Sequence, residues 1–227
     1  MLSRLNFCRL SRPVAAAVLL LAAAQLSLSQ APTPRHPKTI YLDSNGRPIS
    51  NNEFVDLRLA NPADKTDPAT KRITDDGDTE FVIKAPRQEG TRAPEFEVPT
   101  IDGKLYRSSD LKGKVVVLNF WFIGCPNCLG ELVNLNSLRS KFKDERDVVF
   151  IAVAPDTPAE IRSFIKQNPF SYELVGSARS IVDLFNFRGF PRNIVIGRDG
   201  RIAYWRSVVY AWDKFESVIR EELDKKY

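Results

Sequence analysis

A single stretch of this sequence restricts the fold more than any other: an apolar run from Lys114 to Phe122, followed closely by Cys125-Pro126-Asn127-Cys128. A nearly continuous apolar run of this length predicts a strand that is buried on both faces. Apolar residues then recur at a helical spacing, which predicts a helix over residues 125–142. The stretch therefore predicts a buried strand, a tight turn and a helix that begins at a pair of cysteines.

The elements that follow place this stretch in an α/β fold. A second apolar run predicts a buried strand over 148–154, and the capping box Thr157-Pro158-Ala159-Glu160 begins a helix that ends near Gln167. The remaining expected elements are a short strand, a short helix, two strands around a turn and a closing helix, at 172–175, 180–185, 193–196, 202–207 and 212–223. This order predicts a mixed central sheet with helices on both faces.

Residues 91–227, which hold this pattern, are expected to form the main domain. Its first element is a β-hairpin, because candidate strands at 96–101 and 104–106 flank Asp102-Gly103, a pair typical of hairpin turns. We expect this hairpin to be an N-terminal addition to the central sheet.

Residues 30–90 are polar and rich in proline, and we expect them to form an extension or a linker. They contain candidate short strands at Thr39–Leu42 and Glu80–Lys84. Residues 61–78 are charged and contain prolines and a glycine, so they are expected to be a loop.

The first 29 residues have the pattern of a signal peptide. Three arginines and no acidic residue precede a short apolar run from Val14 to Ala24. Cleavage fits after Ala24 or after Ser29. The run is shorter than the roughly 20 residues that cross a bilayer comfortably, so an uncleaved anchor is the alternative. The protein is therefore expected to be exported, periplasmic or extracytoplasmic, or tethered by this segment.

The charge pattern gives no reason to expect a nucleic-acid partner. The formal net charge is +5, and it falls to +2 when a signal peptide with its three arginines is removed. The sequence has no Lys- or Arg-rich run of the kind that binds nucleic acid.

The cysteine count favours redox chemistry over a structural use. Of the three cysteines, Cys8 lies in the basic leader, which leaves Cys125 and Cys128. A structural disulfide would close only a very short loop and stabilise little. Zinc needs four ligands, and the one histidine, His36, lies in the extension. No metal and no cofactor are expected.

The position of the pair explains what it can do. A cysteine at a helix N-terminus lies near free N–H groups and the positive end of the helix dipole, which stabilise a thiolate. Cys125 is therefore the expected nucleophile, and Cys128, one turn along, can attack the resulting mixed disulfide. Pro126 suits the first turn of the helix because it lacks an N–H.

Residues 91–227 resemble the TlpA/ResA branch of the thioredoxin superfamily, within the wider AhpC/TSA–redoxin group. The matching segments are Ala93-Pro94-Glu95-Phe96, Leu111-Lys112-Gly113-Lys114, Val117-Leu118-Asn119-Phe120-Trp121, the CPNC pair, Glu131 and Gly189-Phe190-Pro191. The resemblance implies a thioredoxin fold and a protein-disulfide oxidoreductase whose redox-active disulfide joins Cys125 and Cys128.

The resemblance also implies two roles near the cysteines. Glu131 is expected to tune the thiols and to take a proton from the resolving cysteine; an ordinary solvated helix glutamate is the alternative. Pro191 is expected to follow a cis peptide bond, with a loop proline as the alternative. Val133 departs from the family, in which many members have proline at this position.

Further residues around the pair are expected to contact the substrate. They are Trp121, Pro126, Asn127, Phe190, Pro191 and Arg192. Trp121 is expected to be a partly exposed lid, with burial in the core as the alternative. Phe190 is a candidate substrate contact and Arg192 a candidate thiolate stabiliser, and a plain surface position is the alternative for both.

The expected function is reduction of disulfides in extracytoplasmic proteins by dithiol exchange. Its partners would be thiol and disulfide proteins, with a membrane electron donor of the DsbD/CcdA type. A thiol peroxidase and a non-catalytic binding module are the alternatives, although residues 121–124 lack the proline and threonine that peroxiredoxins place before their cysteine. A copper-handling protein would need a wider cysteine spacing and a core histidine.

Overall fold

A computed structural model describes residues 35–60 and 67–226. The expected signal peptide and Cys8 lie outside the described residues. The chain divides into two units, Met1–Pro37 and Lys38–Tyr227. Of the first, only residues 35–37 are described, and they have no regular secondary structure. Within the described ranges, no helix is both long enough and apolar enough to cross a membrane.

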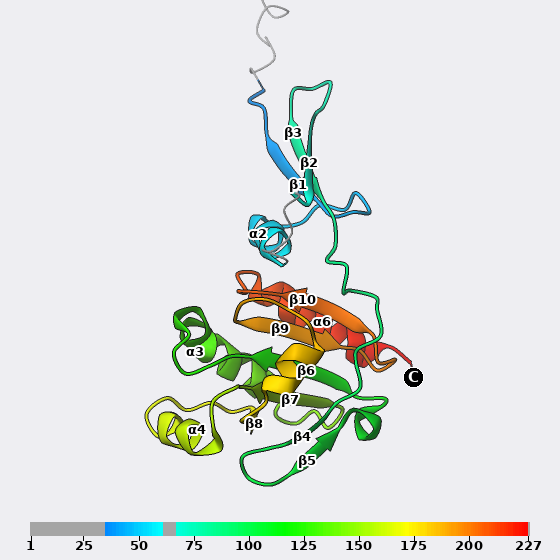
Figure 1. Cartoon of the computed structure of the whole chain (residues 1–227). Helices are drawn as coiled ribbons and strands as arrows, with labels where there is room; N and C mark the ends of the chain where they lie inside the picture. The colour runs from blue at the N-terminus through cyan, green and yellow to red at the C-terminus, as the bar shows by residue number, and fades with distance from the viewer. Residues whose placement is uncertain (1–34, 61–66, 227) are drawn as a thin grey trace, which may run out of the picture. The chain divides into compact units, whose positions relative to one another are not determined.

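The second unit is built on a five-stranded sheet with the strand order β10-β9-β6-β7-β8 (Figure 1). The bounds are β6 Val115–Phe120, β7 Val148–Val153, β8 Glu173–Val175, β9 Arg192–Ile196 and β10 Ile202–Arg206. Strands β6, β7 and β8 pair in parallel, whereas β9 is antiparallel to both β6 and β10. The mixed sheet predicted from the sequence is therefore confirmed.

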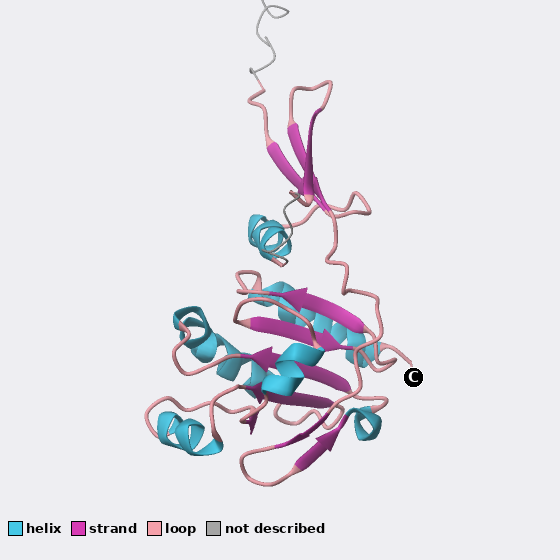
Figure 2. Cartoon of the chain, viewed as in Figure 1, coloured by secondary structure: helices cyan, strands magenta, loops and turns pink. Residues whose placement is uncertain are grey.

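Helices cover both faces of this sheet (Figure 2). Their bounds are α3 Pro126–Lys141, α4 Pro158–Ile165, α5 Arg179–Leu184 and α6 Trp212–Asp224, with a 3₁₀ turn at Ser108–Leu111. Figure 1 shows α5, in yellow, in front of the sheet and α3 and α6 behind it. The α/β architecture thus has the expected layers.

The two faces of β6 explain why there is a core on each side. Successive strand residues point to opposite faces. Val115 and Val117 pack with residues of α3, α4 and α6, whereas Val116 and Leu118 pack with α5 and the hairpin strands β4 (Glu97–Pro99) and β5 (Leu105–Arg107). Every residue of β6 is buried, as its continuous apolar sequence predicts.

Residues 38–60 and 67–90 contain more regular structure than the sequence suggests. Strands β1 (Thr39–Leu42), β2 (Ala69–Ile73) and β3 (Thr79–Ile83) form a small sheet in the order β1-β3-β2. Helix α2 (Asn51–Leu59) packs Phe54 and Leu57 against Ile83 of this sheet. The candidate strands near residues 39 and 80 are present.

The expectation of a loop over 61–78 is wrong for residues 69–73, which form β2, and its part at 61–66 lies outside the described residues. The residues of β2 are mostly exposed, so the strand shows no apolar alternation, and it is held by backbone pairing to β3 and by an Arg72–Glu80 ion pair. Helix α2 is also absent from the sequence prediction, although Ser50 caps it by accepting from the Glu53 amide at 3.1 Å. That Ser-x-x-Glu spacing is a helix-start signal that the sequence offers.

Candidate functional site

The two cysteines lie where a buried strand turns into a helix. After β6, the Trp121 amide still donates to the Val153 carbonyl at 3.0 Å, and the chain then turns so that Cys125 is the N-cap of α3. Pro126 occupies the first helical turn. The local order of strand, turn and helix is the one predicted from the sequence.

Cys125 and Cys128 are joined by a disulfide with an S–S distance of 2.07 Å. The Cys128 amide donates to Cys125 Sγ at 3.2 Å, so the sulfur lies at one of the free amides of the first helical turn. The cysteines are 4% and 2% exposed, while Pro126 and Asn127 between them are exposed. When the pair is reduced, this arrangement favours a thiolate on Cys125.

The turn before the cysteines is fixed from the end of a neighbouring strand. Asp156, which follows β7, accepts a hydrogen bond of 3.1 Å from the Ile123 amide. The Cys125 amide donates to the Phe122 carbonyl at 3.1 Å. These bonds hold the turn in the shape that places Cys125 at the helix start.

Glu131 lies one turn after Cys128 and is buried, with 3% exposure. Its Oε2 accepts from the Asn193 side-chain amide at 3.0 Å, and its Oε1 accepts from the Val209 amide at 2.6 Å. Burial raises its pKa to about 7, although the two hydrogen bonds oppose that rise and nearby Asp56 adds to it. Glu131 is not a solvated surface glutamate, and it can exchange a proton near neutral pH.

Asn193 connects Glu131 to the central sheet. It lies in β9 directly opposite Asn119 of β6, and the Asn119 side-chain amide donates to Asn193 Oδ1 at 2.9 Å. Asn193 also donates to the Ser207 carbonyl at 2.9 Å. A buried, fully bonded amide of this kind fixes the Glu131 carboxylate between strand β9 and the segment that follows β10.

The structure brings Phe190 and Pro191 to the same end of the sheet. The Phe190–Pro191 peptide bond is cis, as expected. Phe190 is half-buried, and its ring centroid lies 5.3 Å from that of Phe122, in the turn before the cysteines. Pro191 itself is buried.

The expectation that Trp121 forms a partly exposed lid is wrong. Its side chain is 1% exposed and packs between aromatic rings that belong to segments much later in the sequence. The Phe164 and Phe170 ring centroids both lie 5.5 Å away. Trp121 is therefore part of the core under the site and does not offer a surface to a substrate.

Arg192 also differs from its expected position. Its side chain is 1% exposed, donates to the Ala60 carbonyl, and lies over the rings of Phe187 and Trp205 at 5.5 and 5.0 Å. Burial lowers its pKa to about 10, so it remains a cation at neutral pH. Because the guanidinium points into this buried aromatic cluster, the expected substrate contact is not available to it.

Two candidate functional residues are missing from the sequence prediction. Asn193 has only one signal, a polar residue in an apolar strand. Asp56 lies in α2 and contacts the segment beside Glu131, and nothing local in the sequence marks it. Both residues form their hydrogen bonds with residues that lie far away in the sequence.

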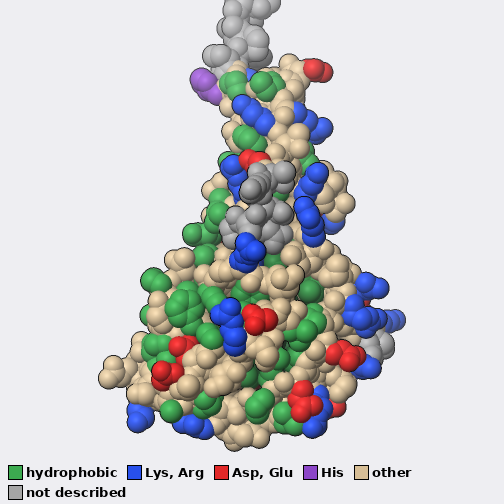
Figure 3. Space-filling view, viewed as in Figure 1, with side chains coloured by type: hydrophobic (Ala, Val, Ile, Leu, Met, Phe, Trp, Pro, Cys, Tyr) green, Lys and Arg blue, Asp and Glu red, His purple; other side chains and the backbone are tan. Residues whose placement is uncertain are grey.

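The side-chain chemistry of the described residues bears on two further kinds of site, a metal centre and a nucleic-acid surface. Within residues 35–60 and 67–226, no group of three or more His, Cys, Asp or Glu residues could hold a metal ion. On the face drawn in Figure 3, Lys and Arg side chains occur in small groups separated by other residues. This face has no continuous basic patch of the kind that follows a nucleic-acid backbone.

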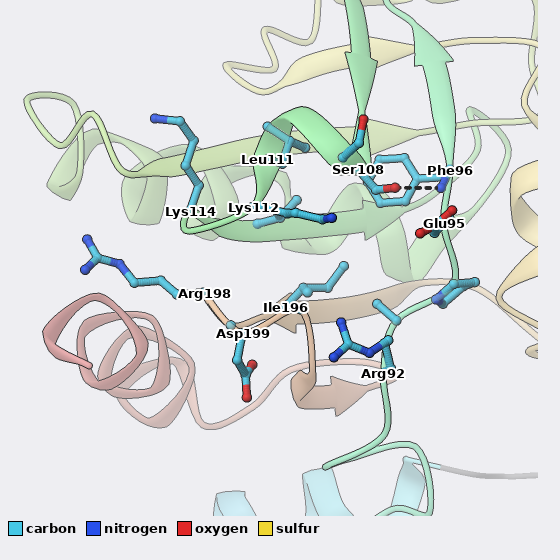
Figure 4. A pocket seen from close by; sticks show the side chains of 16 residues that line it. Arg92, Glu95, Phe96, Ser108, Leu111, Lys112, Lys114, Ile196, Arg198 and Asp199 are labelled. Atoms are coloured by element: carbon cyan, nitrogen blue, oxygen red, sulfur yellow. Dashed lines mark hydrogen bonds between the residues drawn. The ribbon is translucent and has the colours of Figure 1, made fainter. Parts of the chain in front are cut away.

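A separate cavity of about 270 Å³ lies near the turn between β9 and β10 (Figure 4). Charged side chains around it include Arg92, Lys112 and Arg198 (Figure 4). Its lining includes none of the residues expected at the redox site. It is distinct from the CPNC site.

Comparisons with known proteins agree with this fold. The model of the AhpC/TSA family matches residues 90–205. A thiol-disulfide oxidoreductase ResA of Bacillus cereus is 30% identical over 123 residues, which are 54% of this chain and 71% of the relative.

Two solved structures share the fold. One, from Chlorobium tepidum and assigned as a thiol:disulfide interchange protein DsbE, is 26% identical with a TM-score of 0.53, and the match covers 60% of this chain and 97% of that one. Another, from Bacteroides thetaiotaomicron and assigned as a protein disulfide isomerase, is 29% identical with a TM-score of 0.55, covering 60% and 91%.

Proposed function

Because the chain belongs to the AhpC/TSA family, in its TlpA/ResA-type thioredoxin-like branch, and is a protein-disulfide oxidoreductase, we propose that it reduces disulfides of proteins outside the cytoplasm. The observation that supports this most is the disulfide at the start of α3, with Cys125 Sγ at a free helix amide. The names of the relatives point to the same reaction class.

The proposed reaction begins with the reduced pair. The Cys125 thiolate attacks one sulfur of a substrate disulfide, forms a mixed disulfide and releases the other substrate sulfur as a thiolate, which takes up a proton. The Cys128 thiolate then attacks Cys125 Sγ, and the second substrate thiolate leaves. Two electrons pass to the substrate, and the Cys125–Cys128 disulfide is the oxidised product.

We assign the proton transfer of the second step to Glu131. Cys128 must lose its proton before it attacks, and Glu131 lies one helical turn away with a pKa of about 7. A carboxylate with this pKa accepts a proton from a thiol more readily than an ordinary glutamate does. Pro126 and Asn127, exposed between the cysteines, and half-buried Phe190 beside Phe122 are the proposed substrate contacts.

The proposed setting follows from the N-terminal sequence. Residues 1–29 would direct export, and the oxidised pair would be returned to the dithiol by a membrane donor of the DsbD/CcdA type, which supplies two electrons. N-terminal sequencing of the mature protein tests the export step. A start at Gln25 or Gln30 supports cleavage, whereas an intact Met1 in a membrane fraction supports the tether.

Reduction of insulin by the full chain with dithiothreitol tests the central reaction. Wild type should accelerate insulin precipitation, Cys125→Ser should abolish the acceleration, and Cys8→Ser should leave it unchanged as a matched control. A peroxide-consumption assay run in parallel separates the alternative. Peroxide turnover without insulin reduction would make the protein a thiol peroxidase and refute this proposal.

A further inference from the structure

Carboxylates from two different helices accept hydrogen bonds from backbone amides of one short segment, Ser207–Ala211. Glu131 of α3 accepts from the Val209 amide at 2.6 Å. Asp56 of α2 accepts from the next two amides, with Oδ1 2.8 Å from the Tyr210 nitrogen and Oδ2 2.9 Å from the Ala211 nitrogen. Three consecutive backbone amides are thus bound by two acids that lie far apart in the sequence.

Helix α2 is held against this region by further contacts. The Asn52 side-chain amide donates to the Tyr210 carbonyl at 3.4 Å, and the Ala60 carbonyl at the end of α2 accepts from buried Arg192. Ala60 is 1% exposed and belongs to the same apolar core as β9 and β10. Helix α2 is therefore bonded to the segment by Asn52 and Asp56, and the Ala60 carbonyl after its last residue is bonded to β9.

Asp56 is well suited to hold the segment. Ala211 is the N-cap of α6, which has no side-chain cap of its own, so Asp56 supplies the acceptor and the negative charge that a helix start favours. Asp56 is 1% exposed, and burial raises its pKa while the two amides and Arg206 oppose the rise. An acid buried with two amide donors fixes their direction.

We propose that Asp56 is a positioning residue for the active site: by binding the Tyr210 and Ala211 amides, it holds the segment that presents the Val209 amide to Glu131. This inference rests on the proposed function only for the role given to Glu131. It makes residues 50–60 of the extension a working part of the redox site, although their sequence lies outside the thioredoxin-like region.

The direction in which the pKa of Glu131 shifts can distinguish two roles for Asp56. The charged and titratable groups that act on this cluster are Asp56 and Glu53 from α2, Tyr172 ahead of β8, and Tyr204 and Arg206 from β10. The Val209 hydrogen bond lowers the pKa of Glu131, whereas the charge of Asp56 raises it by less. Losing the hydrogen bond and losing the charge therefore move this pKa in opposite directions.

The experiment follows the Glu131 carboxyl carbon by NMR against pH in the oxidised full chain, in which the bonded cysteines do not titrate. Its signal is assigned by its absence in Glu131→Gln. Asp56→Ala should raise the Glu131 pKa by roughly one pH unit, because the ionised form loses a hydrogen bond. A fall would show that Asp56 acts only as a charge, and an unchanged pKa would show that removing Asp56 does not cost Glu131 its Val209 hydrogen bond by more than the lost charge offsets; either result overturns the proposal.

A matched control lies in the same extension. Asp67 is exposed, pairs with Arg58 at 2.7 Å and accepts from the Ala69 amide rather than from an amide of the Ser207–Ala211 segment. Asp67→Ala should leave the Glu131 pKa at the wild-type value. A rise equal to that of Asp56→Ala would mean that any loosening of the extension has this effect, which contradicts a specific role for Asp56.

A milder substitution, Asp56→Asn, provides a second test if the Asp56→Ala protein does not fold. Asn in place of Asp56 has a single acceptor oxygen, so one of the two amides loses its partner. Asp56→Asn should speed hydrogen exchange about tenfold at Val209 as well as at Tyr210 or Ala211. Faster exchange at Tyr210 or Ala211 with unchanged exchange at Val209 would overturn the proposal.

The positioning role of Asp56 and the proposed function can be tested independently. The Glu131 titration and amide exchange need no catalysis, whereas insulin reduction tests the dithiol reaction. A protein that shows the predicted Glu131 shift but does not reduce insulin supports the positioning role of Asp56 and refutes the function. A protein that reduces insulin but does not show the shift supports the function and refutes the positioning role of Asp56.

Discussion

The side-chain amide of Asn193 donates a hydrogen bond of 3.0 Å to Oε2 of Glu131, and so ties the acid beside the cysteines to the strand that follows Pro191. The same amide nitrogen also donates to the Ser207 carbonyl at 2.9 Å. Glu131 is therefore held by the sheet on one oxygen and by the segment after β10 on the other.

The first prediction concerns Asn193. Asn193→Ala should raise the pKa of Glu131 above about 7, because the ionised carboxylate loses a donor. It should also lower the free energy of unfolding by about 1–3 kcal/mol, because the buried Asn119 amide loses its acceptor. Carboxyl NMR and denaturant unfolding check the two effects. Asn168→Ala, at an exposed site, is the control, and an equal loss of stability there would contradict the assigned network.

The second prediction concerns the pH dependence of stability. The folded-state pKa of Glu131, about 7, lies above its ordinary value of 4.5, so the folded state holds more protons than the unfolded state between these pH values. The free energy of unfolding should therefore fall as pH rises from about 4.5 to about 7, by up to roughly 3 kcal/mol from this group.

Glu131→Gln provides the comparison for that prediction, since glutamine does not titrate. Urea unfolding of the oxidised forms of both proteins across this pH range isolates the contribution of Glu131. Parallel pH profiles for wild type and Glu131→Gln would show that the buried acid has no raised pKa.

The third prediction distinguishes the two cysteines. Cys128→Ser should accumulate a mixed disulfide between Cys125 and a substrate protein, because the resolving attack is lost while the first attack remains. Non-reducing electrophoresis and mass spectrometry measure the adduct. Cys125→Ser should form much less of it; equal trapping by both variants would remove the assignment of Cys125 as the nucleophile.

The fourth prediction concerns Trp121. Because the ring is buried between Phe164 and Phe170, Trp121→Ala should lower the free energy of unfolding by about 3–5 kcal/mol. Val133→Ala, at a position that is 78% exposed on α3, should change it by less than about 0.5 kcal/mol. A Trp121→Ala protein of wild-type stability that has lost insulin reduction would instead restore the lid expected from the sequence.

Local patterns predicted the parts of the site that depend on near neighbours. The continuous apolar sequence of β6 predicted its full burial, and the CPNC pair after it predicted the start of α3. Thr157 and Glu160 form the capping box read from the sequence. These features need only a few consecutive residues to form.

The errors arose where distant segments pack together. Trp121 is buried by Phe164 and Phe170, which come after α3 and β7 in the sequence. Arg192 is buried by contact with Ala60 of the extension. The contacts of Asp56 span more than 150 positions, from α2 to the start of α6. No periodicity or spacing within one segment encodes such pairings.

The pH dependence of iodoacetamide alkylation in the reduced full chain, resolved by mass spectrometry for each cysteine, tests the central claim most directly. Cys125 should react faster than Cys128 at neutral pH, with an apparent pKa below the value of about 8.5 for a free cysteine. If both thiols stay unreactive in the folded protein across the range in which a free cysteine titrates, the start of α3 does not activate a nucleophile and the proposed reaction is excluded.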